Sequence, residues 1–210
     1  MTDAATFWDK HAKGYAKSPI SDVAAYEYTL GRTRSYLSEK DRVLEVGCGT
    51  GSTAVLLAAN VAHITGTDFS EGMITIARGR AEGVANAKFT QADLFETNVD
   101  GGPFDVVLAH NVLHLIADIE GAVQVLRDHV KPGGLFISKT VCAPESRLPL
   151  KLRAIMMILP LMQFFGKAPY VNFMKIPAFD QLITDAGFRI IESGNHPANP
   201  PCRYVVARKL

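Results

Sequence analysis

The 210-residue sequence predicts an α/β fold with a doubly wound, mostly parallel sheet. Short apolar segments rich in β-branched residues alternate with helix-compatible segments from residue 43 to residue 140, which is the pattern of repeated strand–helix units. Apolar residues make up 48% of the chain, which suits a sizeable core and argues against disorder. We therefore expect one domain over residues 1–210.

The first predicted strand ends in a glycine-rich loop that opens a helix. Gly47, Gly49 and Gly51 follow the strand at Val43–Val46, and a helix predicted from Ser52 to Asn60 comes directly after. Glycines allow a ligand to approach the backbone, and the start of a helix presents free N–H groups. The loop therefore predicts a cofactor site at the carboxyl end of this strand.

Two residues argue against a dinucleotide at this loop. The dinucleotide pattern G-x-G-x-x-G requires glycine at position 52, where the chain has Ser52. Glu45, at the end of the strand, would repel a pyrophosphate and attract a ligand that carries an ammonium and a sulfonium. A nicotinamide-dependent oxidoreductase is therefore the less favoured alternative.

The segment from Glu45 to Gly51, EVGCGTG, resembles motif I of the class I S-adenosylmethionine-dependent methyltransferases. At the level of motifs the resemblance covers Val43 to Phe136. It is closest to the small-molecule branch that includes the ubiquinone and menaquinone biosynthesis methyltransferases. The resemblance implies a Rossmann-like sheet of seven strands with one antiparallel strand and helices on both faces. It also implies S-adenosylmethionine as the cofactor and methyl transfer to a small molecule.

Carboxylates follow the second and third predicted strands. Asp68 ends the strand His63–Asp68, about 20 residues past the glycine loop, where such folds place an acid for ribose hydroxyls. The alternative for Asp68 is an N-cap of the next helix, a role that Ser70 can fill. Asp93 follows the strand Lys88–Gln91, and the resemblance implies an adenine contact there. A loop aspartate that caps a turn is the alternative for Asp93.

The predicted cofactor site combines the glycine loop and these carboxylates with apolar side chains for the adenine and with the segment after the fourth strand, Phe104–Leu108. The resemblance also implies an aromatic side chain from the N-terminal segment. The predicted members are Tyr15, Glu45, Gly47, Cys48, Gly49, Asp68, Phe69, Met73, Asp93, Leu94, His110 and Asn111.

Two histidines, His110 and His114, follow the fourth strand at a spacing that puts them on one face if this segment is helical. No glutamate stands beside the first histidine and no third ligand is near in the sequence, so we predict no metal site. The resemblance places this segment beside the sulfonium. We predict that His114 is a general base, and a structural histidine remains the alternative.

Residues 1–38 are predicted to form a helical cap. Thr6–Lys17 has an amphipathic pattern, and a second helix is expected from Ser21, as its N-cap, to about Ser38. The resemblance implies that this segment covers the cofactor, with Tyr15 at its methionine part. Two surface helices packed on the core are the alternative.

Residues 144–176 interrupt the alternation with a long apolar segment rich in methionine. Its most apolar part, Ala154–Met162, is shorter than the roughly 20 residues of a spanning helix. A core helix, a contact with a second subunit or a membrane surface, and a lid are the alternatives. We predict a lid that includes Met156 and Met157, and hence a largely apolar acceptor.

The remaining elements complete the predicted sheet. A helix at Asp118–Val130 ends in a Lys-Pro-Gly-Gly turn, and the later elements are a strand at Leu135–Thr140, a helix at Pro177–Gly187, a strand at Phe188–Ser193, a loop at Gly194–Pro201 and a strand at Tyr204–Ala207.

Charge and cysteine content narrow the class of protein. A net charge of +1 without a long basic run gives no support for nucleic-acid binding. Three scattered cysteines favour a reducing cytoplasm, and the polar N-terminus does not resemble a signal peptide. The sequence leaves open a homodimer, peripheral contact with a membrane, and a non-catalytic regulatory protein that binds S-adenosylmethionine.

Overall fold

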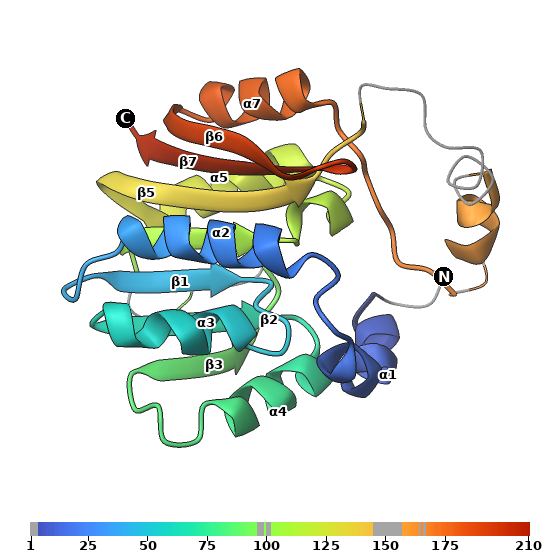
Figure 1. Ribbon diagram of the computed structural model, residues 1–210, viewed down its shortest axis with the longest axis horizontal. Helices are drawn as coiled ribbons and strands as arrows, with labels where there is room; N and C mark the ends of the chain where they lie inside the picture. Colours follow the sequence, from blue (N-terminus) through green and yellow to red (C-terminus); the bar gives the residue numbers. More distant parts are fainter. Residues whose placement is uncertain (1–3, 96–98, 100–101, 145–156, 164, 166) are drawn as a thin grey trace.

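The computed structural model describes residues 4–95, 99, 102–144, 157–163, 165 and 167–210. Its centre is a seven-stranded sheet in the order β3-β2-β1-β4-β5-β7-β6 (Figure 1). Neighbouring strands from β3 to β5 pair in parallel, and β7 is antiparallel to both β5 and β6. The strands are β1 (Arg42–Val46), β2 (His63–Asp68), β3 (Ala87–Gln91), β4 (Phe104–His110), β5 (Val130–Val141), β6 (Phe188–Ala198) and β7 (Pro201–Lys209). The predicted Rossmann-like α/β fold is confirmed.

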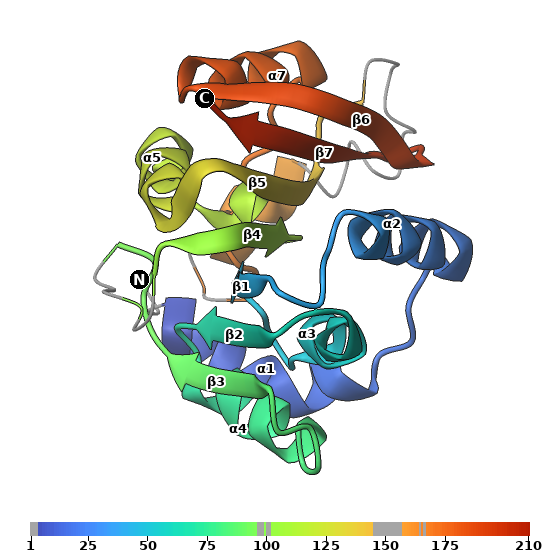
Figure 2. The same ribbon diagram turned by 90° about the vertical axis from the view of Figure 1, so that its left-hand side faces the viewer.

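Helices cover both faces of this sheet. Figure 2 shows α2 and α3 on one side of it and α5 and α7 on the other. The helices are α1 (Ala4–Lys17), α2 (Val23–Ser35), α3 (Ser52–Leu57), α4 (Glu71–Arg80), α5 (Ile119–His129) and α7 (Ile176–Asp185), with 3-10 turns η1 (Ala58–Asn60) and η2 (Leu113–Leu115).

The central strands are apolar on both faces. Leu44 and Phe136 pack in one core with α5 and α7, whereas their chain neighbours Val43 and Ile137 pack in the other with α3 and α4. Successive strand residues point to opposite faces, so a strand buried on both sides needs a continuous apolar run. Three buried residues of the described strands carry charged side chains instead of apolar or uncharged ones. These are Glu45, Asp68 and Lys139, and each lies near the carboxyl end of its strand.

The second helix differs from its prediction at both ends. Asp22, not Ser21, is its N-cap, because the Asp22 carboxylate accepts the backbone N–H of Ala25 at 2.9 Å. The helix ends at Ser35 and not near Ser38. The Ser38 N–H instead binds the side chain of Asp41 at 2.8 Å, which starts a separate turn before β1.

The loop predicted at Gly194–Pro201 is wrong, because β6 and β7 stay paired almost to their connection. Their ladder includes the pair of Gly194 with Tyr204 and, beyond an irregularity, the pair of Ala198 with Pro201. β6 is an edge strand, where a proline such as Pro197 does not break a central ladder, and Pro201 is the first residue of β7.

The Pro-Gly-Gly turn that was expected before the fifth strand lies inside it. β5 begins at Val130, which pairs with Phe104, and after an irregularity the ladder resumes where Val106 pairs with Leu135. Gly133 has a φ of 73°, which few other residues adopt easily. The extra residues therefore bulge out of the ladder without ending the strand.

Part of the predicted lid lies outside the described residues, including Met156. Residues 157–163 are helical, and Figure 1 shows this orange helix and α1 near the end of the sheet toward which β1 points. Met157 is 83% exposed. None of the helices in the described part of the chain is long and apolar enough to cross a membrane.

Candidate cofactor and acceptor site

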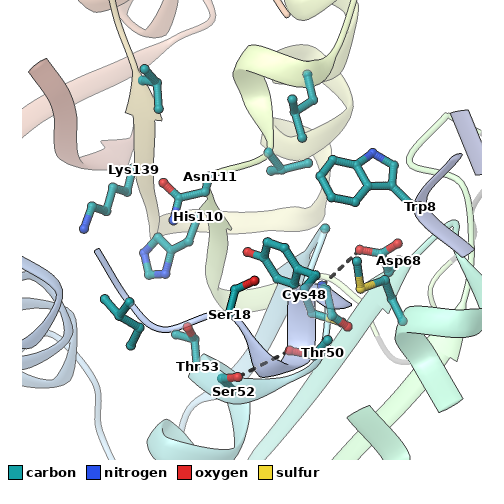
Figure 3. Close-up of a pocket in the computed structure, with 18 of the residues that line it drawn as sticks. Trp8, Ser18, Cys48, Thr50, Ser52, Thr53, Asp68, His110, Asn111 and Lys139 are labelled. Atoms are coloured by element: carbon teal, nitrogen blue, oxygen red, sulfur yellow. Dashed lines mark hydrogen bonds between the residues drawn. The ribbon is translucent and has the colours of Figure 1, made fainter. Parts of the chain in front are cut away.

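A cavity of about 730 Å³ opens at the carboxyl ends of the central strands (Figure 3). This volume lies in the range of small-molecule sites. Ten of the predicted site residues line it: Tyr15, Glu45, Gly47, Cys48, Gly49, Asp68, Phe69, Met73, His110 and Asn111. Three do not belong to the described lining: Asp93, Leu94 and His114.

The glycine loop lies against this cavity in a conformation that needs glycine. Gly47 has a φ of 62°, and a Cβ added there would meet Val112 Cγ2 at 2.4 Å. Gly51, with a φ of 73°, is the N-cap of α3, and a Cβ there would meet the Cβ of Ala77 at 2.8 Å. Side chains at these positions would displace the neighbouring elements, so the loop packs this closely only with glycine.

The carboxylate of Glu45 lies in the cavity wall, and one of its oxygens has no hydrogen-bond partner in the described part of the chain. The residue is 3% exposed, and its Oε2 has no hydrogen-bond partner in the described part of the chain. Burial raises the pKa of Glu45 to about 8, with a smaller contribution from the charge of Asp68 and an opposing one from a backbone hydrogen bond at Ala54. A buried carboxylate of this kind can receive a cationic group.

Asp68 ties the glycine loop to the end of β2. Its Oδ2 accepts the N–H of Gly49 at 3.0 Å, and its Oδ1 accepts the N–H of Ser70 at 2.9 Å. Ser70 is the N-cap of α4, as predicted, and its hydroxyl accepts the N–H of Met73. Each carboxylate oxygen of Asp68 keeps acceptor capacity for a ligand hydroxyl. Burial raises the pKa of Asp68, although both backbone hydrogen bonds oppose that shift.

The N-terminal helix α1 supplies aromatic side chains to the cavity. Tyr15 lies over the glycine loop, with its Cε1 4.0 Å from the position of a Cβ built on Gly49. The Trp8 ring meets the Tyr15 ring edge-on at a centroid distance of 5.9 Å. Burial, followed by the charges of Asp68 and Glu45, raises the pKa of Tyr15.

Polar contacts that the sequence did not reveal hold α1 against α4. Asp9 accepts a hydrogen bond from the Ser70 hydroxyl, and at the other end Arg80 Nη2 donates to the carbonyl of Ala16 at 3.1 Å. Arg80 Nη1 also donates to the Thr50 hydroxyl at 2.6 Å. The same guanidinium therefore binds both α1 and the glycine loop.

Asp93 forms the turn that the alternative interpretation expected, in which a loop aspartate caps a turn. It is exposed, and its Oδ1 accepts the N–H of Phe95 at 2.8 Å, which closes a turn. Leu94 packs against the core that includes α5. Their adenine-binding role stays a prediction.

The two histidines do not share a helix face. His110 ends β4, and Asn111 follows it in the left-handed region with a φ of 56°. The backbone therefore changes direction between His110 and the short 3-10 turn η2, which contains His114. His110 lines the cavity, and its Nε2 is buried without a partner among the described residues. Burial, and then the charge of Lys139, lower the pKa of His110 to about 4.

His114 is not among the residues of the described cavity lining. Its carbonyl accepts the N–H of Asn172 at 2.7 Å, and burial lowers its pKa to about 4. Its Nδ1 is buried and has no partner in the described ranges. Its side chain is therefore neutral at pH 7, and its role as a base stays a prediction. The described residues bring together no group of three His, Cys, Asp or Glu side chains that could hold a metal ion.

Lys139 is a cavity residue that the sequence analysis missed. It lies on β5 in register with His110 on β4, and it is 8% exposed. Its Nζ donates to the hydroxyl of Thr29 in α2 at 3.1 Å. Burial lowers the pKa of this lysine. The available signal was a single lysine within the predicted strand Leu135–Thr140, because charged residues are rarely buried in a central strand.

Comparison with known proteins matches this chain to methyltransferases. A family model described as a methyltransferase domain matches residues 44–136. The ubiquinone biosynthesis O-methyltransferase of Acinetobacter baylyi is 27% identical over 208 residues, which cover 96% of this chain and 84% of that protein. These similarities identify residues 44–136 as a methyltransferase domain and support a class I S-adenosylmethionine-dependent methyltransferase.

Two further similarities support the family. The demethylmenaquinone methyltransferase of Clavibacter sepedonicus is 34% identical to this methyltransferase over 98 residues, or 46% of this chain, and the match spans only 40% of that relative. A solved structure of a DhpI–SAH complex has a TM-score of 0.76 at 23% identity and covers 98% of this chain and 95% of its own, which shows the shared fold. The methyltransferase-domain match indicates S-adenosylmethionine as the cofactor, and the nicotinamide-dependent and non-catalytic alternatives gain no support.

Proposed function

We propose that this methyltransferase transfers the methyl group in line to a small, largely apolar molecule that binds beside His110. The observation that carries the cofactor half of this proposal is the buried Glu45 carboxylate, whose Oε2 has no partner in the described part of the chain. Bound S-adenosylmethionine supplies a methyl group made electrophilic by a sulfonium. The protein's task is to hold donor and acceptor in line, which can lower the barrier by several kcal/mol.

The residues around the glycine loop fit this cofactor. Glu45 would receive the ammonium of the methionine part, and Asp68 would accept from the ribose hydroxyls. Phe69 and Met73 offer apolar surface for the adenine, and Tyr15 would cover the methionine part. Gly47, Cys48 and Gly49 would contact the cofactor through the backbone, His110 and Asn111 would lie beside the sulfonium, and Asp93 and Leu94 would contact the adenine.

We place the acceptor against a part of the cavity wall that has apolar side chains. Val141 of β5, Tyr170 and Pro200 line it. The names of the two relatives, which are ubiquinone biosynthesis and demethylmenaquinone methyltransferases, support a lipophilic ring compound as the acceptor. An apolar wall with few polar groups suits such a molecule.

Two segments would close over this site within a single domain of residues 1–210. Trp8 and Tyr15 of the N-terminal cap, residues 1–38, line the cavity, as do Pro169 and Tyr170 of the proposed lid, residues 144–176. We assign the protein to the cytoplasm because its three cysteines are free thiols. A second subunit or a membrane surface would make contact at exposed apolar side chains of the proposed lid, namely Met157, Ile158, Leu161, Met162 and Phe165.

A binding assay followed by a transfer assay tests the proposal. Calorimetry with S-adenosylhomocysteine is expected to show binding, and NAD is expected to show none. Labelled methyl from S-adenosylmethionine should then reach at least one member of a panel of phenols, quinols, amines and thiols. Absence of S-adenosylhomocysteine binding would refute the cofactor site. Transfer that occurs only to strongly polar acceptors would refute the apolar acceptor site.

A further inference from the structure

We propose that Lys139 is the acceptor-binding residue of the cavity and that it receives an anionic oxygen of an otherwise apolar acceptor, with His110 beside it. This inference rests on the proposed function and names the group that selects its acceptor. Two separate features carry it: a buried amine with unused donors, and a buried imidazole nitrogen without a partner in the described chain.

The amine of Lys139 has more hydrogen-bonding capacity than its described surroundings use. Its one hydrogen bond there goes to Thr29 Oγ1, which itself donates to the carbonyl of Ala25 at 2.9 Å. A lysine ammonium has three donors, so two remain. The described ion pairs include none to Lys139. A buried ammonium without a paired anion is unfavourable, and an anion that enters the cavity would supply the missing charge.

None of the nearby titratable groups in the described part of the chain forms an ion pair with Lys139, so we expect a ligand to supply the anion. Asp22 at the start of α2 is the carboxylate whose charge favours the ammonium of Lys139, and it forms no ion pair with it. Burial raises the pKa of the Cys202 thiol on β7 to about 11, so this nearby group is uncharged at pH 7. His110 is held neutral, since its pKa is about 4. Tyr204, the register partner of Lys139 on β7, directs its hydroxyl to Thr33 at 3.3 Å. Among the described groups, Asp22 therefore contributes a negative charge to the cavity wall, but none of them forms an ion pair with the amine.

His110 lies on the same part of the cavity wall. The register of β4 and β5 pairs His110 with Lys139, so both side chains project from neighbouring strands at the same level. Figure 3 shows Lys139, His110 and Asn111 together on one side of the cavity, with Trp8 and Asp68 on the other. The unpartnered Nε2 of neutral His110 can donate to the same acceptor oxygen in one of its tautomers.

This arrangement separates the two halves of the cavity by charge. The carboxylates Glu45 and Asp68 suit the cationic end and the hydroxyls of the cofactor, whereas Lys139 suits an anion. An acceptor oxygen that binds already ionised, with its proton lost to solvent, needs no general base in the protein. An ionised hydroxyl and a carboxylate share this chemistry, and the experiment distinguishes them.

The experiment uses two probes with the protein saturated in S-adenosylhomocysteine, so that no methyl transfer is needed. 4-Nitrophenol reports its ionisation by absorbance, and benzoate binding is measured by calorimetry. Wild-type protein is expected to bind at least one probe, and bound 4-nitrophenol should ionise at a pH at which the free probe is mostly protonated. Ionisation of the phenol points to a hydroxyl acceptor, and preference for benzoate points to a carboxylate.

Lys139→Met removes the charge and keeps a chain of similar length. We expect it to weaken probe binding by about 10- to 100-fold, as for a lost hydrogen bond to a charged group, with S-adenosylhomocysteine affinity retained. Lys40→Met, an exposed lysine outside the described cavity lining, is the matched control and should change nothing. Lys139→Arg, which keeps a cation, should recover part of the probe affinity.

The outcomes separate this inference from the proposed function. Equal probe affinity in wild type and Lys139→Met, or wild-type protein that binds S-adenosylhomocysteine but neither probe, would overturn the role of Lys139. Wild-type protein that does not bind S-adenosylhomocysteine would instead overturn the proposed function. If Lys139→Met fails to fold, the comparison of wild type with Lys139→Arg replaces it, and probe affinity that is unchanged in Lys139→Arg overturns the role of Lys139.

Discussion

The Asp9 carboxylate in α1 accepts a hydrogen bond from the hydroxyl of Ser70, the N-cap of α4, over an oxygen–oxygen distance of 2.6 Å. The same carboxylate oxygen accepts the N–H of Gly72 at 2.9 Å. A negative charge at the N-terminus of a helix is favourable, and both hydrogen bonds lower the pKa of Asp9. This contact fixes the helix that carries Trp8 and Tyr15 over the glycine loop.

The first prediction concerns this docking of α1. Asp9→Ala should release α1 from α4 and, since α1 supplies aromatic side chains to the cavity, weaken S-adenosylhomocysteine binding severalfold. Trypsin should cut at Lys10, Lys13 or Lys17 faster than in wild type, and bound cofactor should slow the cut. The control is Glu71→Ala, which removes an exposed carboxylate at the same end of α4. Equal proteolysis in Asp9→Ala and wild type would contradict the docking role.

The second prediction is a pH dependence of cofactor binding that originates at Glu45. Without ligand its pKa is about 8, so at pH 7 the carboxyl is mostly protonated, whereas an ammonium partner requires the carboxylate. Binding should therefore release a proton at pH 7, and affinity should fall as pH decreases from 8 to 6, by up to about tenfold per pH unit. Calorimetry in buffers of different ionisation enthalpy measures the released proton.

Glu45→Gln should abolish this proton release and this pH dependence, and it should bind more weakly at pH 8. Glu39→Gln, in an exposed turn, is the control with the same chemical change. A Glu45→Gln protein that binds as wild type does at both low and high salt would show that charge is not involved.

The third prediction separates two roles of Asp68. Asp68→Ala should weaken S-adenosylhomocysteine binding by about 1–3 kcal/mol, the range for hydrogen bonds to a charged group. It should also lower the Tm, because the N–H groups of Gly49 and Ser70 lose their acceptor. An analogue without ribose hydroxyls tests the direct contact. A loss of affinity that is equally large for this analogue would leave Asp68 with only the structural role.

The fourth prediction compares the two histidines. The cavity geometry predicts that His110→Ala lowers turnover and leaves cofactor affinity nearly unchanged. His114→Ala should mainly lower stability, because its side chain lies outside the described lining. Turnover, cofactor affinity and Tm are measured for both variants. A loss of turnover and an altered pH–rate profile in His114→Ala alone would instead support the base role predicted from sequence.

The fifth prediction concerns the proposed lid. Tyr170→Ala removes a cavity wall and Met157→Asp puts a charge on the exposed helix at residues 157–163, so both should raise the KM for an apolar acceptor while cofactor binding persists. Ile191→Asp, at an exposed position on the edge strand β6, is the control. If Met157→Asp only dissociates an oligomer, the segment is an interface and not a lid.

The sequence by itself determined the sheet and the part of the cavity wall that holds the glycine loop, Glu45 and Asp68. The carboxyl ends of parallel strands meet at one edge of the sheet, so the positions of Glu45 and Asp68 near the ends of β1 and β2 were enough to bring them together. The glycine spacing identified the loop, and Ser70 was recognised as an N-cap from its local pattern. All of these signals are local in the chain or follow from the order of strands.

Only the tertiary structure decided which side chains complete the site. Lys139 reaches Thr29 across 110 residues of sequence, and Asp9 reaches Ser70 across 61. The left-handed Asn111 separates His110 from His114, so that only the first lines the described cavity. A local pattern carries no information about such partners, because the direction and burial of a side chain depend on elements packed against it from elsewhere in the chain.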